Sequence, residues 1–471
     1  MLGHPAVPEL MEGSLASRPP RAAARLTLLA VTVLGTMSNN VINVPLRSIA
    51  RDFDETLSAT VLCVSAFVLA LAIAMPVTGW IGDQIGQKRT LVLSLVLMVA
   101  AQALAALAPS LPLLVVLRGV QGLACSAIPP MVMGLLGAYY PDRRLEVMGA
   151  WAAANGIGQA IGPPVGGLIS DAIGWRGIFV LVALFSALVL VATVLLVPEV
   201  PHRRSPFDVW GALLLTGGVG LVLVAATTVS QRTSTRVAVV EVVAGVVLLL
   251  GYGLSSRGRA VAMIPLPVLI ESRFLRSAAA AFGQMFSLGA ALVALPLFFT
   301  GPLGMSVAMA GILFFALPAV MAVAAPIVSR LSRAHGPRVV LRSGLVVLVV
   351  ANTVTGVVAT LGSGTPTRVG LTAMLLVLGA GMACVQTPAA AGATSSPAGA
   401  YGAAVGLFSM VRFSGSGTAA AWVALLYPSG HLLLLFCGCA VLALLALGAS
   451  FLGPDPAPMV TSELTRTSGL G

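Results

Sequence analysis

Two short stretches of the chain, far apart in sequence, share one pattern. Residues 79–91 read GWIGDQIGQKRTL, and residues 329–341 read SRLSRAHGPRVVL. At an offset of 250 positions the stretches align a glycine (Gly86 with Gly336) and a basic residue (Lys88 with Arg338). Each stretch joins two apolar segments of the chain. A degenerate repeat of this kind predicts a molecule built from two similar halves.

The composition places the chain in a lipid bilayer. Of its 471 residues, 58% are hydrophobic and 9% are charged, which excludes a soluble protein and a soluble enzyme on a membrane anchor. A helix needs about 20 apolar residues to cross the hydrocarbon core. Segments of this kind lie near residues 26–46, 57–80, 90–108, 111–139, 146–169, 176–197, 209–230, 237–255, 277–299, 307–328, 339–361, 369–391, 401–427 and 431–452.

These segments predict an all-α polytopic membrane protein with 14 transmembrane helices. Six helices form an N-terminal half at residues 26–197, and six form a C-terminal half at residues 277–452. A joint at residues 198–276 carries two inserted helices, and residues 1–25 and 453–471 are tails. The first apolar run lacks a small-residue cleavage pattern, so we expect an uncleaved span rather than a signal peptide.

The basic residues predict the orientation in the membrane. The chain has 26 Lys and Arg against 15 Asp and Glu. With the N-terminus inside, 18 of the 26 fall in cytoplasmic segments, six fall outside, and two lie within spans. Both tails are therefore predicted to be cytoplasmic. The basic residues stand singly or in pairs between apolar runs, which favours anionic lipid over nucleic acid as their partner.

Cysteine and histidine residues give no indication of an enzyme or a metal site. The five cysteines all lie in apolar segments, where cysteine behaves as a small hydrophobic residue. The four histidines are scattered without the spacing of metal ligands. We therefore expect no disulfide framework, no cofactor and no catalytic residues.

The stretch 79–91 carries the first recognisable motif. Gly79 and Gly86 permit a tight turn and a close approach of helices, and Asp83 beside Lys88 and Arg89 can hold neighbouring helix ends in one conformation. The stretch resembles motif A of the major facilitator superfamily. The resemblance implies that these five residues control conformational switching and do not touch the substrate. The alternative is a solvated charged turn.

A buried arginine marks the fourth span. Arg118 lies in Leu-Arg-Gly-Val-Gln-Gly, which resembles motif B of the same family. An arginine at a helix centre costs roughly 2.5 to 3.5 kcal/mol, so it needs a partner or a water-filled cavity. Gln121 and Cys125 share its helix face. A role in proton relay or cavity charge and a purely structural hydrogen bond between helices both remain open.

Small residues dominate the fifth span. Gly158, Gly162 and Gly166 recur every four residues and predict a smooth strip for close helix packing, followed by Gly167. The pair Pro163 and Pro164 should bend the helix. The stretch resembles motif C of the antiporter branches of the family. The alternative is an ordinary Gly-x-x-x-Gly packing face.

Over most of residues 26–452 the chain resembles the 14-spanner drug-proton antiporter branch. Arg412, in the thirteenth span, looks like the late arginine of that branch. One position departs from the pattern, because Ser38 stands where the branch usually has an aspartate in the first span. Glu241 is the one acidic residue that we place in a span, so it joins Arg118 and Arg412 as a candidate proton-relay or cavity charge. Its alternative is a water-facing residue at a helix end.

Two intramembrane arginines without a matching carboxylate predict a neutral to positive central cavity. We therefore expect a neutral, zwitterionic or anionic amphiphile as substrate, because cations would be repelled. The expected lining combines polar and aromatic side chains from both halves. The candidates are Asn40, Asn43, Gln121, Trp151, Asn155, Gln159, Phe282, Gln284 and Phe286.

The sequence therefore predicts a secondary exporter of drugs or antibiotics in a bacterial cytoplasmic membrane. It would work by alternating access in exchange for protons, with the proton gradient as its energy source, without a cofactor or an obligatory protein partner. Self-protection of an antibiotic producer is a role suggested by analogy. An uncoupled facilitator or importer is the alternative, favoured by Ser38. A receptor without transport is disfavoured by the intact motif A.

Overall fold

The computed structural model describes residues 22–201, 208–230, 234–256, 264 and 266–453, and in these residues every regular element is a helix. The predicted tails lie outside the described residues, except for residues 22–25 and 453. The same holds for Arg203, Arg204, Arg257 and Arg259 of the joint. The all-helical class expected from the composition is confirmed for the described chain.

The N-terminal group of helices follows the predicted spans closely. The elements are α1 (Ala22–Asn40), η1 (Val41–Asn43), α2 (Leu46–Asp52), α3 (Leu57–Ile85), α4 (Gln87–Ala106), α5 (Leu111–Ser126), α6 (Ile128–Tyr139), η2 (Pro141–Arg143), α7 (Arg144–Ile173) and α8 (Trp175–Leu196). The segment 111–139 is two helices rather than one. The break at Ala127 precedes two consecutive prolines, which lack the N–H groups that a continuous helix requires.

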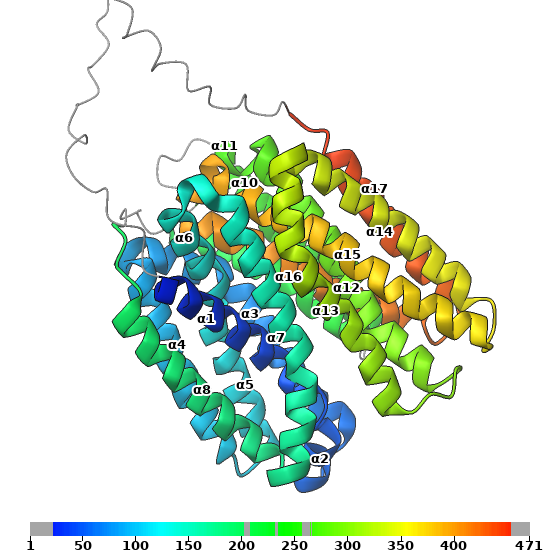
Figure 1. Ribbon diagram of the computed structural model, residues 1–471. Helices are drawn as coiled ribbons and strands as arrows, with labels where there is room; N and C mark the ends of the chain where they lie inside the picture. The colour runs from blue at the N-terminus through cyan, green and yellow to red at the C-terminus, as the bar shows by residue number, and fades with distance from the viewer. Residues whose placement is uncertain (1–21, 202–207, 231–233, 257–263, 265, 454–471) are drawn as a thin grey trace, which may run out of the picture.

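The inserted and C-terminal helices complete the molecule. They are α9 (Val209–Ser230), α10 (Thr235–Ser255), α11 (Leu266–Leu269), α12 (Ser272–Thr300), α13 (Val307–His335), α14 (Pro337–Ala359), α15 (Thr365–Ser395), η3 (Pro397–Ala400), α16 (Gly402–Leu426) and α17 (Leu432–Ala449). The blue-to-teal helices of the N-terminal group stand beside the lime-to-red helices of the C-terminal group (Figure 1).

Twelve helices of the described chain are long and apolar enough to cross a membrane. The two predicted spans outside this set are α7 and α16, helices of 30 and 25 residues. Both are rich in glycine and polar side chains, which lowers their hydropathy. They also lie between the two halves, where small and polar residues face protein rather than lipid. The count of 14 spans therefore remains a prediction.

Helix pairing separates two halves and an insert. Within the first half α3 packs on α5, α4 on α8, and α1 on α7; within the second, α12 packs on α16 and α14 on α15 and α17. The halves meet where α3 contacts α16 and where α7 contacts α13. Helices α9 and α10 pack on each other, and α9 reaches α3 and α16.

The two repeated stretches end their helices in the same way. Gly86 caps α3 with φ of 97°, and Gly336 caps α13 with φ of 88°. Side chains other than glycine rarely adopt this left-handed region. Both turns lie at one end of the bundle, away from α2 (Figure 1). We call it the Arg-rich end, defined by Arg25, Lys88, Arg89, Arg143, Arg144, Arg330, Arg333, Arg338 and Arg342.

At the opposite end a carboxylate joins the N-terminal helices. Asp52, the last residue of α2, accepts hydrogen bonds from the indole Nε1 of Trp175 at 3.1 Å and from the guanidinium of Arg176. The bond from Arg176 holds the pKa of Asp52 below its ordinary value. These contacts fix the start of α8 against the end of α2 within one half.

The glycine strip of α7 packs against α1. A Cβ atom on Gly158 would lie 1.9 Å from Thr36 Oγ1, and one on Gly166 would lie 2.0 Å from the carbonyl oxygen of Val41. Only glycine permits these approaches, because 2.0 Å from a backbone atom cannot be relieved by a rotamer change. Pro163 and Pro164 lie inside the continuous helix α7.

Substitution of two adjacent glycines of α7, Gly166 and Gly167, should change the stability of the protein to different extents. Gly166→Ala should destabilise the protein by about 1–3 kcal/mol, because the new methyl group overlaps the backbone of Val41 in η1, directly after α1. Gly167→Ala is the matched control, since its Cβ would lie 3.5 Å from Val44, an ordinary contact. Thermal unfolding of the detergent-purified variants measures the difference. Equal midpoints for the two variants would contradict the packing described here.

Candidate functional site

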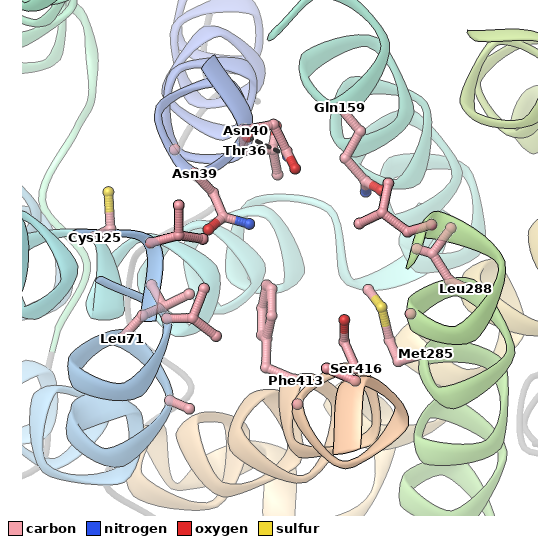
Figure 2. Close-up of a pocket in the computed structure, with 18 of the residues that line it drawn as sticks. Thr36, Asn39, Asn40, Leu71, Cys125, Gln159, Met285, Leu288, Phe413 and Ser416 are labelled. Atoms are coloured by element: carbon pink, nitrogen blue, oxygen red, sulfur yellow. Dashed lines mark hydrogen bonds between the residues drawn. The ribbon is translucent and has the colours of Figure 1, made fainter. Parts of the chain in front are cut away.

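A cavity of about 630 Å³ lies between the two halves. Its walls come mainly from α1, α3, α7, α12 and α16, with one or two residues each from η1, α5, α6 and α9. Figure 2 shows side chains pointing into this one space. The lining is mostly apolar, with a few amides and hydroxyls. The polar and aromatic lining residues are Thr32, Thr36, Asn39, Asn40, Asn43, Ser65, Trp151, Asn155, Gln159, Phe413 and Ser416. Such a lining suits an amphiphilic guest.

Five of the predicted cavity residues line this space, namely Asn40, Asn43, Trp151, Asn155 and Gln159. They come from α1, from η1, which follows it directly, and from α7, and they repeat with helical spacing on the face toward the cavity. The amide of Asn40 donates to the Thr36 carbonyl at 2.8 Å, which leaves its oxygen free to face the cavity. Figure 2 shows Asn39, Asn40 and Gln159 arranged around the opening between α1 and α7.

Four predicted cavity residues lie elsewhere, which corrects the expectation. Gln121 is buried between α4 and α5, where it accepts a bond from Arg118 and donates to the Ala101 carbonyl at 3.1 Å. Phe282 and Phe286 pack where α12 crosses α16. Gln284 is fully buried outside the lining. The face of α12 that reaches the cavity instead carries Met285, Leu288, Gly289, Leu292 and Val293.

Phe413 and Ser416 are cavity residues that the sequence analysis missed. Figure 2 shows the Phe413 ring projecting from α16 into the cavity, with Ser416 beside it. They stand one and four positions after Arg412, so a helical projection of the residues near Arg412 could have indicated them as cavity residues. Ser416 also touches Gly289 of α12, where a Cβ on the glycine would lie 2.8 Å from the Ser416 Cα.

Arg118 ties three helices together. Its Nε donates to the Cys63 carbonyl at 3.2 Å, and Nη1 donates to the Ser38 carbonyl at 3.3 Å and to Gln121 Oε1 at 2.9 Å. The guanidinium also lies 4.2 Å from the centre of the Phe67 ring. These contacts with α1, α3 and α5 satisfy most of its donors, and Arg118 does not line the cavity. The geometry favours the structural alternative for this residue.

Arg412 and Glu241 also lie outside the cavity lining. Arg412 is 1% exposed and lies over the rings of Trp151 and Phe413, at 5.1 and 5.0 Å from their centres. Glu241 belongs to α10, which packs on α9 and does not reach the cavity. Its assignment as a cavity charge is therefore corrected. Among the described lining residues none is acidic.

The Arg-rich end is closed by direct contact of α3 with α16. A Cβ on Gly79 would lie 2.1 Å from the carbonyl oxygen of Gly402, so the two backbones touch. Asp83 accepts the backbone N–H of Gly402 at 2.8 Å and that of Ala403 at 3.3 Å. These N–H groups open α16, and a carboxylate at a helix N-terminus is stabilised by the helix dipole.

The basic pair of the same stretch has other partners. Lys88 Nζ donates to the Val194 carbonyl at 2.9 Å, and Arg89 forms an ion pair with Glu199 at 3.3 Å. The first contact joins α4 to the last turn of α8, and the second joins α4 to the segment that follows α8. In this conformation Asp83 therefore bridges the halves, while Lys88 and Arg89 stabilise the turn from its own side.

A second contact closes the same end between α7 and α13. Glu146, in the first turn of α7, pairs with Arg25 at 3.1 Å, with Arg143 at 2.7 Å and with Arg333 of α13 at 3.8 Å. Arg144 donates to the Thr394 carbonyl across the halves. This network was not among the expectations drawn from the sequence.

The two contacts explain why the repeat has an aspartate, Asp83, in its first stretch and an arginine, Arg333, at the same position of its second. Asp83 and its counterpart Arg333 each face the start of a long helix in the other half, α16 or α7. An aspartate is attracted by a helix N-terminus, whereas an arginine would be repelled. Glu146 in the first turn of α7 reverses the local sign, so Arg333 binds there. The cavity lies on the far side of these contacts.

Removing the charge of Asp83 should open the Arg-rich end. In Asp83→Asn the attraction to the α16 dipole is lost, worth about 0.3–2 kcal/mol, which raises the open population up to roughly 30-fold. Ser329 is 3% exposed and lies in the α7–α13 contact, so Ser329→Cys in a chain without other cysteines reports opening. The measurement is its labelling by an impermeant maleimide from the Arg-rich side.

The control for this experiment is Asp142→Asn, which removes the same charge from an exposed residue in the turn before α7. Labelling should stay at the parent rate in this control. Arg333→Ala should cause a smaller increase than Asp83→Asn, because its 3.8 Å ion pair is partly exposed. An unchanged labelling rate in Asp83→Asn would exclude the contact as a determinant of closure.

Comparison with known proteins identifies a family and relatives to which this chain is similar. Residues 26–283 match the family model described as Major Facilitator Superfamily. The chain is 31% identical to the probable actinorhodin transporter of Streptomyces coelicolor, over 64% of this chain and 52% of that protein. It is 28% identical to the multidrug resistance protein Stp of Mycobacterium tuberculosis, over 80% of this chain and 70% of that protein. The chain thus spans about half the length of the first of these relatives.

Solved structures support the fold alone. The human organic anion transporter MFSD10 superposes with a TM-score of 0.68 at 17% identity, covering 92% of this chain and all of that one. The proton:xylose symporter XylE gives a TM-score of 0.64 at 14% identity, covering 90% of this chain and 94% of that one.

Proposed function

The chain belongs to the major facilitator superfamily, and we propose that it exports small amphiphilic drugs or antibiotics by alternating access. The observation that carries the proposal is the cavity between the halves, which is lined by amides, hydroxyls and aromatic rings. Contacts between the halves close this cavity at the Arg-rich end. Relatives named as a probable actinorhodin transporter and a multidrug resistance protein support the same function.

The proposed topology gives these contacts a direction. The chain crosses a bacterial cytoplasmic membrane 14 times with both termini and the Arg-rich end in the cytoplasm, in keeping with the excess of basic residues there. The conformation described above is then closed to the cytoplasm. Opening the α3–α16 and α7–α13 contacts exposes the cavity to cytoplasmic substrate. No enzymatic step and no protein partner takes part.

Proton exchange is the proposed source of energy. A substrate leaving against its gradient needs a second gradient, and the proposal assigns this role to the protonmotive force. No cofactor is required. Glu241 stays a proposed proton-relay residue, on a helix that packs on α9.

One observation favours an uncoupled facilitator as the second candidate. Ser38 is fully buried beside Arg118, and its hydroxyl has no hydrogen-bond partner in the described chain. A hydroxyl there cannot accept a proton at physiological pH as a carboxylate would. A facilitator on the same scaffold would move its substrate down the substrate gradient only.

Inverted membrane vesicles with an acid interior distinguish the two candidates. Neutral and anionic amphiphilic antibiotics should collapse the pH gradient when this protein is present, since inward substrate movement is exchanged for protons. Quaternary ammonium compounds should collapse it poorly. Gly402→Val provides an inactive control, because its side chain would strike Gly79 and block closure of the Arg-rich end.

Movement of labelled compound without any collapse of the gradient would replace the antiporter with the facilitator. Ser38→Asp should then restore coupling. Absence of any movement, with a protein of normal abundance, would remove both candidates.

A further inference from the structure

Arg118 and Arg412, buried deep in their helices, have different surroundings. Arg118 makes three hydrogen bonds, whereas the Nε, Nη1 and Nη2 atoms of Arg412 make none with the described residues. Both side chains are 1% exposed. Retaining an ionised guanidinium without hydrogen-bond partners is costly, so Arg412 calls for a function that Arg118 does not.

Two aromatic rings pack against the guanidinium of Arg412. The guanidinium lies 5.1 Å from the Trp151 ring and 5.0 Å from the Phe413 ring, and both rings line the cavity. Trp151 belongs to α7 of the N-terminal half, whereas Arg412 and Phe413 belong to α16 of the C-terminal half. The Trp151–Arg412 contact therefore crosses between the halves and must change when they move apart.

Neutral polar groups accompany Arg412 at the same depth. Gly289 of α12 touches Ser416 of α16, so these two residues lie at the same depth. The fully buried Gln284 precedes Gly289 by five residues, and Arg412 precedes Ser416 by four. Both side-chain atoms of Gln284 lack hydrogen-bond partners in the described chain. Two helices thus carry unsatisfied donors at one level, on the Arg-rich side of Ser416.

We propose that Arg412 binds the carboxylate of an amphiphilic organic acid, with Trp151 as its gate. The inference rests on the proposed export function and names the substrate class of the same cavity. In the present conformation Trp151 covers the guanidinium. When the Arg-rich end opens, α7 moves away and Arg412 becomes accessible to an anion from that side. The aromatic body of the acid then occupies the cavity beside Phe413.

The charges around the cavity favour an anion. A carboxylate supplies the acceptors that Nη1, Nη2 and Nε lack, in the bidentate geometry that arginine prefers. Within the described lining no carboxylate of the protein competes for them. Closure of the Arg-rich end returns Trp151 to the guanidinium, and its cation–π contact replaces the bound anion. Substrate is thereby released toward the opposite end.

Anthraquinone-2-carboxylate and its methyl ester test the proposal, because they share a ring system and differ in charge. In proteoliposomes of the full chain we expect the carboxylate to be transported at least tenfold faster than the ester. Arg412→Gln should reduce carboxylate transport at least tenfold and leave ester transport unchanged. Arg412→Lys should keep part of the preference. Arg342→Gln is the matched control, since it removes one positive charge from the Arg-rich end and should preserve the preference.

A thermal unfolding measurement accompanies the transport assay. Arg412→Gln should unfold at the parent temperature or higher, because it removes a buried charge that has no hydrogen bonds. A lower midpoint would assign Arg412 a structural role and overturn the site. Equal transport of both probes by the parent chain, or equal loss of both in Arg412→Gln, would also overturn it while leaving export intact. Failure of the parent chain to move either probe would count against the export function itself.

Discussion

The structure depends on how closely two helices from different halves approach each other at the Arg-rich end. Gly79 and Gly402 allow α3 and α16 to touch through their backbones, and the carboxylate of Asp83 then reaches the free N–H groups that open α16. With that end closed, the space between the halves survives only on the other side, as the cavity. A larger residue at either glycine would hold the helices apart and leave Asp83 without its partners.

Each half uses the same architecture with charges of opposite sign. Asp83 meets a bare helix N-terminus, while Arg333 meets one whose first turn carries Glu146. Arg118 and Arg412 differ in a similar way. Arg118 donates hydrogen bonds to backbone carbonyl groups of neighbouring helices. Arg412 makes no hydrogen bond with the described residues and packs against two aromatic rings. An arginine therefore links helices in the N-terminal half, and another is a candidate binding group in the C-terminal half.

Much of this could be predicted from the sequence because hydropathy and glycine spacing act locally. The spans, the two halves and the cavity face of α7 follow from patterns within single segments. The cavity face of α12 could not be predicted, because Phe282, Gln284 and Met285 are similar candidates until α16 covers some of them. Glu241 appeared important only because it is a rare charge in an apolar segment. The break at Ala127 was hidden because an apolar segment can be one helix or two.

The central claim is that the two halves move as bodies to expose one cavity alternately at its two ends. Paired spin labels at Asp142 and His335 report the Arg-rich end, and labels at Asp54 and Ser363 report the opposite end, since all four residues are exposed. Pulsed electron resonance distances in the full chain should show the first pair separating and the second approaching when Asp83→Asn is introduced. Distances that change at one end only, or at neither, would contradict the account.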